Sequence, residues 1–220
     1  RWMYKKKYSS LTILIPVYNE KKNFQEFILK LKKKFKILVI DDCSTDGTHN
    51  FLKKKKINFI RNKKNLGYED SLIKGFSIIK KDKKNKYILT MDGDGQHNPK
   101  FVENIFHFSL RNNLDVAIGE RYKKNRLIEK LISIIFRIKY NLNDPLSGFK
   151  IYKKAKIKKI NLLKVNRFFL VDFLIMLIKK KNKIRNFKIK TNSRSDDPRV
   201  GNLFSIYLKM IKILFYVFIR

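Results

Sequence analysis

Apolar runs and helix-like segments alternate through the first half of this chain. The apolar runs predict strands at Leu11–Val17, Phe35–Ile40, Ile57–Ile60, Tyr87–Met91 and Val116–Ile118. The segments between them have a helical pattern and predict helices at Asn23–Lys34, Thr48–Lys55, Glu69–Lys81 and Pro99–Arg111. Continuous apolar strands are typically buried on both faces, and strands that alternate with helices form parallel sheets. The pattern therefore predicts an α/β fold with a mainly parallel central sheet flanked by helices.

The second half contains two segments that are typical of amphipathic helices, Arg126–Tyr140 and Leu203–Ile219. Each places polar residues on one stripe, namely Arg126, Lys130, Ser133 and Arg137 in the first and Ser205, Lys209, Lys212 and Tyr216 in the second. At about 1.5 Å per residue the second helix would be roughly 26 Å long, which is short of a hydrocarbon core of about 30 Å. Its pattern favours a helix lying in a membrane interface, and packing on the domain or on a partner subunit is the alternative.

The length of 220 residues suits one domain, and no linker rich in Pro, Gly or Ser divides the chain. We expect an α/β domain over residues 1–200, followed by the amphipathic helix in residues 201–220. Cys43 is the only cysteine, which excludes an internal disulfide and disfavours a zinc cluster. We expect no signal peptide, because residues 1–10 lead directly into a strand-like run.

The chain carries 53 Lys and Arg against 18 Asp and Glu, a formal net charge of +35. One explanation is coding bias, since Lys, Ile, Asn and Phe are all abundant, although such a bias should also enrich Glu. The other is a polyanionic partner, and an anionic membrane surface fits best. Nucleic acid is not expected, because the basic runs are not interleaved with stacking aromatic residues.

Carboxylates are scarce in this chain, so their clustering is informative. Six of the 18 acidic residues lie just beyond predicted strands: Glu20, Asp41, Asp42, Asp46, Asp92 and Asp94. In an open parallel sheet, ligands bind in the crevice outside the carboxyl ends of the strands. Three separate segments therefore direct acidic groups to one crevice.

The segment Asp92-Gly93-Asp94-Gly95-Gln96 has the sharpest pattern. Its two carboxylates and the Gln96 amide offer oxygen ligands, which suit Mg²⁺ or Mn²⁺. Its glycines allow a diphosphate to approach the backbone closely. The alternative is a solvated Asp-Gly turn, a common use of these residues.

Several ordered motifs resemble the signature of family 2 glycosyltransferases with the GT-A fold. They are Ile15–Glu20, Asp41–Thr48, Asn65–Gly67, Asp92–His97, Gly119–Arg121 and Asp144–Lys150. The last two resemble the branch that makes polyprenyl-phosphate sugars, the dolichol-phosphate mannose synthase branch. The resemblance covers about Leu11 to Arg199, and it implies a Rossmann-like nucleotide-sugar-binding domain.

The resemblance also implies roles for individual residues. Those that line the nucleotide site or contact its base and phosphates are Pro16, Tyr18, Glu20, Asp42, Asp92 and Arg199. Asp92 and Asp94 would hold the metal with Gln96 nearby, and Arg121 would join these two aspartates in the catalytic group. Ser147 would lie near the acceptor, where Lys150 can add positive charge.

Two positions depart from the family pattern. The acidic residue in the segment Phe168–Leu177 is Asp172 rather than the usual Glu. The Gly-x-Ser-Lys pattern that usually follows the arginine is broken, because Gly201 is followed by Asn202 and Leu203. A phosphate-binding lysine is therefore not assigned there.

We expect an inverting hexosyltransferase that uses a GDP- or UDP-hexose and Mg²⁺ or Mn²⁺. A polyprenyl phosphate is the expected acceptor, since an ionised phosphate needs positioning rather than a general base. The expected location is peripheral, at the cytoplasmic face of a membrane. A close rival is transfer to a saccharide hydroxyl, with a carboxylate or His97 as base. A rival from another class is a non-catalytic basic adaptor, against which the intact Asp92/Asp94 pair argues.

Overall fold

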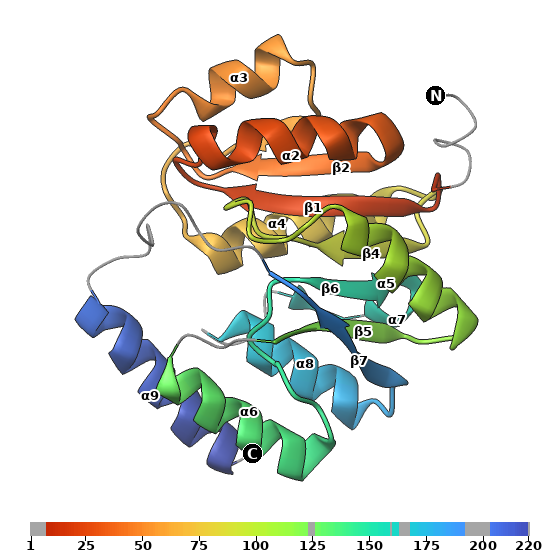
Figure 1. Cartoon of the computed structure of the whole chain (residues 1–220), viewed down its shortest axis with the longest axis vertical. Helices are drawn as coiled ribbons and strands as arrows, with labels where there is room; N and C mark the ends of the chain where they lie inside the picture. Colours follow the sequence, from red (N-terminus) through yellow and green to blue (C-terminus); the bar gives the residue numbers. More distant parts are fainter. Residues whose placement is uncertain (1–7, 123–125, 159, 163–167, 192–202, 220) are drawn as a thin grey trace.

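The computed structural model describes residues 8–122, 126–158, 160–162, 168–191 and 203–219 of the chain. The described strands are β1 (Leu11–Val17), β2 (Lys36–Asp41), β3 (Phe59–Arg61), β4 (Tyr87–Thr90), β5 (Val116–Arg121), β6 (Lys150–Lys153) and β7 (Ile184–Ile189). The described helices are α2 (Lys21–Lys34), α3 (Thr48–Lys54), α4 (Tyr68–Lys81), α5 (Lys100–Arg111), α6 (Leu127–Tyr140), α7 (Lys154–Ile157), α8 (Phe169–Lys179) and α9 (Leu203–Ile219) (Figure 1).

The strands form one sheet in the order β3-β2-β1-β4-β6-β5-β7. The pairs β1–β2, β1–β4, β2–β3 and β5–β7 are parallel, whereas β6 runs antiparallel to both β4 and β5. The prediction of a mainly parallel α/β sheet is thus confirmed, and all five predicted strands are present: β1 has the predicted bounds, and the other four differ by one to three residues at one or both ends. The sequence did not predict β6, α7, α8 or β7.

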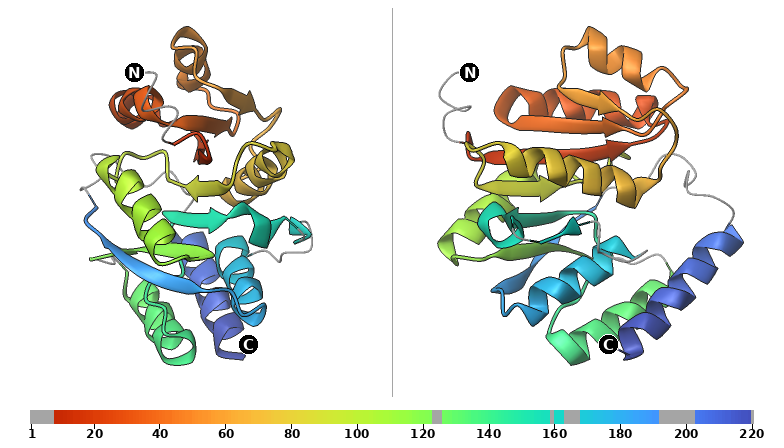
Figure 2. Two further views of the ribbon diagram at one scale, coloured as in Figure 1. Left: turned by 90° about the vertical axis from the view of Figure 1, so that its right-hand side faces the viewer. Right: turned by 180° about the vertical axis from the view of Figure 1, so that it is seen from behind.

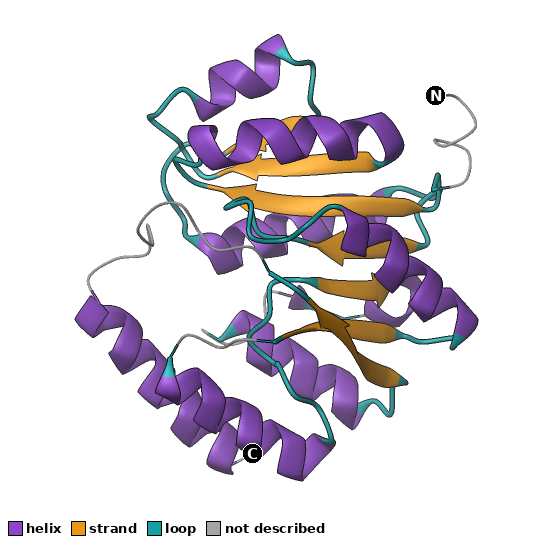
Figure 3. Ribbon diagram, viewed as in Figure 1, coloured by secondary structure: helices purple, strands orange, loops and turns teal. Residues whose placement is uncertain are grey.

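Helices cover both faces of the sheet (Figures 2 and 3). Each covered face contains an apolar core. Ile13 and Ile15 of β1 face the core beneath α2, α3 and α5, while Leu14 between them faces the core beneath α4, α6, α8 and α9. Successive side chains of a strand point to opposite faces, so an uninterrupted apolar strand supplies both cores. All seven residues of β1 are buried, which explains why its sequence is an almost uninterrupted apolar run.

Helices α6 and α9 lie side by side along the lower edge of the molecule in Figure 1. The Lys139 ammonium of α6 donates to the main-chain oxygens of Val217 (3.1 Å) and Phe218 (2.7 Å) at the end of α9. On its other side, α9 meets α8 through a hydrogen bond from the Tyr216 hydroxyl to Asp172. Both helices are confirmed, and α9 packs one face on the domain.

The predicted polar stripe of α6 is partly wrong. Ser133 was expected on this stripe with Lys130 and Arg137, but it is buried, as is Glu129. The apolar residues of α6 instead occupy two faces, because Ile128, Ile132 and Phe136 enter the core while other apolar residues stay exposed. Among the described helices, none is long and apolar enough to cross a membrane.

Candidate functional site

The loops after β1 and β2 are joined by side-chain hydrogen bonds. The side-chain oxygen of Asn19 accepts from the backbone N–H groups of Thr45 (2.7 Å) and Asp46 (3.3 Å). The Asp46 carboxylate in turn accepts from the N–H of Lys21 (2.8 Å) and from the N–H of Thr48 (2.9 Å), which begin α2 and α3. These bonds satisfy donors that the first turn of a helix leaves without partners. The two loops therefore form one wall of the predicted crevice.

Asp42 is buried and holds the loop that leads into α4. Its Oδ1 atom accepts from the Asn62 amide (2.7 Å) and from the N–H of Leu66 (2.9 Å), and its Oδ2 atom accepts from the N–H of Gly67 (2.7 Å). Gly67 has a φ of +90°, a conformation that favours glycine. In this structure Asp42 fixes the 65–67 loop, and its expected contact with a nucleotide base stays a prediction.

Asp92 follows β4 and lies between two segments that are distant in sequence. The Tyr68 hydroxyl, at the start of α4, donates to Asp92 Oδ1 at 2.6 Å. Gly148 lies so close to the same carboxylate that a Cβ atom at this position would overlap with it. The side chain of Asp92 remains 29% exposed, so a ligand can still reach it.

The rest of the Asp92–His97 loop is also ordered by its own side chains. Asp94 Oδ1 accepts from the N–H of Gln96 at 3.0 Å. His97 is buried, and its Nδ1 atom accepts from the N–H of Asp92 at 3.3 Å. Burial lowers the pKa of His97, so the imidazole is neutral at pH 7. With Nδ1 as acceptor, the ring proton lies on Nε2, and neither ring nitrogen is left as a free base.

Arg121 is bound to acidic groups of the fold. Its Nε and Nη2 atoms donate to the two oxygens of Asp144, at 2.8 and 3.0 Å, and Nη2 also lies 3.5 Å from Glu129 Oε2. Burial alone would lower the pKa of Arg121, but the bonds with Asp144 outweigh it and raise this pKa. The guanidinium therefore anchors the loop that begins at Asp144, and its expected contact with phosphate stays a prediction.

Ser147 and Lys150 are buried beneath that same loop. The Lys150 ammonium donates to the main-chain oxygens of Pro145 (2.8 Å) and Ser147 (2.5 Å). Ser147 Oγ accepts from the N–H of Phe149 at 3.2 Å. Burial lowers the pKa of Lys150 to about 7. Both side chains thus support the loop, and their expected contacts with an acceptor stay predictions.

The remaining predicted residues are placed as follows. Pro16 is buried within β1, Tyr18 is half-buried in the loop after it, and Glu20 is buried and accepts from the Asn23 amide at 3.1 Å. Arg199 lies outside the described residues. The sequence did not single out Tyr68 or the close approach of Gly148 to Asp92, although the Asn65–Gly67 motif directly precedes Tyr68.

The oxygen donors that could hold a cation are Asp92, Asp94 and Gln96. Within the described ranges, no group of three or more His, Cys, Asp and Glu side chains is arranged to bind a metal ion. The donor set nevertheless fits Mg²⁺ or Mn²⁺, because such ions take one or two carboxylates and complete their shell with water and ligand phosphates. A cation would therefore bind here together with a diphosphate.

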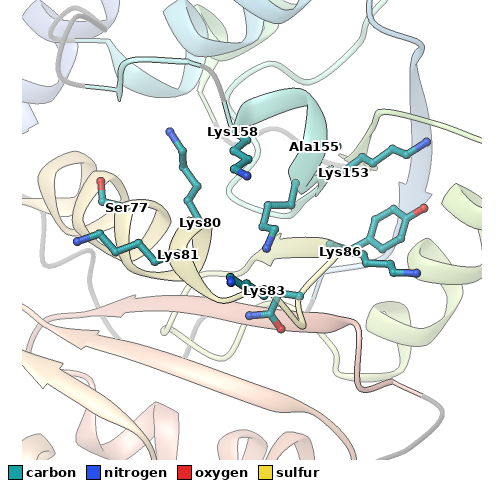
Figure 4. A pocket seen from close by; sticks show the side chains of 11 residues that line it. Ser77, Lys80, Lys81, Lys83, Lys86, Lys153, Ala155 and Lys158 are labelled. Carbon is teal, nitrogen blue, oxygen red and sulfur yellow. The ribbon is translucent and has the colours of Figure 1, made fainter.

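A cavity of about 790 Å³ lies elsewhere, at the start of β4 and the end of β6 (Figure 4). Its lining contains no described carboxylate and consists of Ser77, Lys80, Lys81, Lys83, Asn85, Lys86, Tyr87, Lys153, Lys154, Ala155 and Lys158. Asp92 lies beyond the opposite end of β4, so this lysine cavity and the carboxylate loop are separate. The lysines of this cavity will attract anions. Binding experiments at the carboxylate loop therefore need enough salt to suppress anion binding in the cavity.

Comparison with known proteins gives consistent relatives. The family model described as Glycosyl transferase family 2 matches residues 12–183. A dolichol-phosphate mannosyltransferase of Pyrococcus furiosus is 29% identical over 188 residues, which cover 75% of this chain and 52% of that protein. The chain thus spans about half the length of this relative. An uncharacterized protein of Methanocaldococcus jannaschii is 33% identical over 221 residues, covering 90% of each chain.

Solved structures of glucosyl-3-phosphoglycerate synthase from Mycobacterium tuberculosis share the fold. The complex with Mn²⁺, uridine diphosphate and phosphoglyceric acid has a TM-score of 0.76 and 13% identity, covering 98% of this chain and 79% of that chain. A complex with Mn²⁺, uridine-diphosphate-glucose and phosphoglyceric acid has a TM-score of 0.74 and 13% identity, covering 98% and 80%. At such low identity the likeness establishes the GT-A glycosyltransferase fold.

The close contact between Gly148 and Asp92 is testable by a double-mutant cycle. Gly148→Ala should lower the free energy of unfolding by about 1–3 kcal/mol, the usual cost of overpacking, because the added methyl group displaces the carboxylate. In an Asp92→Ala background the same substitution should cost much less. Urea unfolding of the four proteins measures both values. If Gly148→Ala lowers the free energy of unfolding equally in the two backgrounds, the added methyl group does not clash with Asp92.

Proposed function

Because the chain belongs to glycosyl transferase family 2, we propose that it moves a hexose from a nucleotide-diphosphate sugar to a polyprenyl phosphate at a membrane surface. The observation that carries this proposal is the carboxylate pair Asp92/Asp94, which follows β4 in a loop contacted by α4 and by the 144–148 loop. The Pyrococcus furiosus relative, named a dolichol-phosphate mannosyltransferase, supports this choice of acceptor.

The donor site in this proposal uses the three loops that follow β1, β2 and β4. Pro16, Tyr18, Glu20 and Asp42 would line the nucleoside part, as the resemblance implies. The diphosphate would lie over the carboxylate loop, with Asp92, Asp94 and Gln96 holding Mg²⁺ or Mn²⁺. Such a cation neutralises the negative charge that develops on the departing nucleoside diphosphate. Arg121 and Arg199 would add positive charge around it.

The state of the nearby titratable groups supports an acceptor that is already ionised. His97 has no free ring nitrogen to take a proton, because Nδ1 accepts from the N–H of Asp92. Asp42 and Asp144 each accept hydrogen bonds with both carboxylate oxygens. A saccharide hydroxyl would need a general base, and these three groups are already engaged, whereas a phosphate monoester needs only to be oriented in line with the anomeric carbon.

Helices α6 and α9 support a membrane location for this reaction. Apolar side chains that are at least 40% exposed follow one stripe on each helix: Leu127, Leu131, Ile134 and Ile138 on α6, and Tyr207, Leu208, Ile211, Phe215, Phe218 and Ile219 on α9. Lys139 fixes the C-terminal ends of the two helices together, so they run in parallel. On each helix the exposed stripe lies opposite the buried residues, which are Ile132 and Phe136 on α6 and Ile213 and Val217 on α9.

This apolar face, made of the two stripes above, has basic residues along its edges. Lys130 and Arg137 flank the α6 stripe, and Lys212 flanks the α9 stripe. In the N-terminal half of α9, Lys209 Nζ lies 3.1 Å from Glu69 Oε2. Glu69 is the neighbour of Tyr68 in α4. An exposed apolar face with a cationic rim is typical of helices that lie in an anionic lipid interface. We therefore propose a peripheral location, on the cytoplasmic face of such a membrane.

Metal dependence is tested by Asp94→Asn, which keeps the shape of the side chain but removes its charge. Transfer from a labelled nucleotide sugar should fall by about 100-fold or more at limiting Mn²⁺, since the cation supplies several kcal/mol of transition-state stabilisation. The exposed Asp70→Asn serves as the matched control and should keep full activity. Near-normal transfer by Asp94→Asn at limiting metal would argue against this site.

The acceptor is tested by offering a polyprenyl phosphate, the matching polyprenol and a panel of oligosaccharides with labelled donors. We expect product on the lipid phosphate alone, with a rate that reaches a plateau above the second phosphate pKa of about 6. Product on an oligosaccharide hydroxyl, with the lipid phosphate inert, would instead establish the saccharide transferase. No transfer or donor hydrolysis under any condition would favour a non-catalytic adaptor.

The membrane proposal predicts binding to liposomes that contain anionic lipid. Ile138→Glu and Phe215→Glu should each reduce sedimentation with these liposomes, because a carboxylate would have to enter the apolar layer. Leu110→Glu, at an exposed apolar position of α5 outside this face, is the matched control. Rising salt should also weaken binding, as screening over about 8 Å at physiological ionic strength predicts. Unchanged liposome binding by both variants would show that this face does not bind the membrane. If the wild type forms a dimer and both variants are monomers, the face is instead an interface with a second copy of the chain.

A further inference from the structure

Tyr68 bridges the start of α4 and the carboxylate loop. It is the first residue of α4, and its hydroxyl donates to Asp92 Oδ1 at 2.6 Å across 24 positions of sequence. We propose that Tyr68 is a positioning residue for the cation site: it fixes one oxygen of Asp92 so that the other faces the metal. This inference rests on the proposed function of the site.

The other oxygen of Asp92 is available in this arrangement. In the described part of the chain, no donor lies within hydrogen-bond distance of Oδ2. The Nδ1 atom of His97 lies 3.8 Å from Oδ2 and accepts from the N–H of Asp92 itself. The carboxylate is thus held by Tyr68 on one side and limited by Gly148 on another. The oxygen that remains can bind a cation without breaking an existing bond.

A neutral donor suits this position better than a charged one. A lysine or arginine at Tyr68 would also orient the carboxylate, but its charge would compete with the cation. A tyrosine hydroxyl is a neutral donor, so it can hold the Asp92 carboxylate without adding positive charge beside the cation. Carboxylates that bind metals are commonly held by such hydrogen bonds, and the loss of one typically weakens metal binding by about 10–100-fold.

The position of Tyr68 is itself set by the nucleotide side of the crevice. Asp42 accepts from the N–H groups of Leu66 and Gly67, which directly precede Tyr68. The carbonyl of Gly67 then accepts from the N–H of Ser71 at 3.1 Å in the first turn of α4. A chain of contacts therefore runs from Asp42 through the 65–67 loop and Tyr68 to Asp92. It connects Asp42, which is expected to contact the nucleotide base, with Asp92, which is expected to bind the metal.

The test is Tyr68→Phe, which removes the hydroxyl and keeps the ring. Tyr8→Phe is the matched control, because the hydroxyl of the buried Tyr8 also donates to a carboxylate, Glu103 Oε2 at 2.8 Å, far from this site. Mn²⁺ affinity is measured by electron paramagnetic resonance with saturating uridine diphosphate, at a salt concentration that suppresses binding in the lysine cavity. We expect the dissociation constant to rise about 10–100-fold in Tyr68→Phe and to stay unchanged in Tyr8→Phe.

Two further measurements separate positioning from a purely structural role. Affinity for uridine diphosphate without metal should stay unchanged in Tyr68→Phe, and saturating Mn²⁺ should restore transfer to nearly the wild-type rate. Wild-type Mn²⁺ affinity in Tyr68→Phe, with binding lost in Asp94→Asn, would overturn the role of Tyr68 and leave the proposed function intact. Loss of metal-free nucleotide binding in Tyr68→Phe would assign it a structural role instead. Absence of a nucleotide-dependent Mn²⁺ site in the wild type, with uridine diphosphate and with guanosine diphosphate, would overturn both proposals.

Discussion

The carboxylate of Asp92 is the point at which the separate parts of this site meet. It follows a buried strand, accepts a hydrogen bond from Tyr68 of α4, and lies against the backbone of Gly148. The Gly148 segment is held in turn by the buried Lys150 beneath it and by the partly buried Arg121, which is bound to Asp144. An acidic group thus occupies a densely contacted position in a strongly basic chain, where only a glycine can lie beside it.

Most of the sheet could be predicted from sequence because its central strands are continuous apolar runs. Strands β1, β2 and β4 supply two cores at once, which leaves few polar residues to obscure the pattern. Strands β6 and β7 were missed because lysine and arginine interrupt them, as in Lys150–Lys153 and Ile184–Ile189. The exposed apolar stripe of α6 was not predicted either, because a sequence pattern cannot tell which of two apolar faces meets the core.

The candidate site could be predicted only where its acidic residues directly follow a predicted strand. The Asp92–His97 segment and the Asp41–Thr48 segment are conspicuous on their own, since carboxylates are scarce in this chain. Tyr68 was not predictable, because its role depends on a contact across 24 positions. The burial of Lys150 was equally hidden, since lysine is usually an exposed residue and this one is enclosed by its own loop.

The most direct test of this account is the position of the metal in crystals grown with Mn²⁺ and uridine diphosphate. Anomalous diffraction at the manganese edge locates the ion independently of the protein atoms. We predict one peak at about 2.1 Å from carboxylate oxygens of Asp92 and Asp94, with the diphosphate completing the shell. Ordered uridine diphosphate in the lysine cavity, with no manganese at the carboxylate loop, would contradict it.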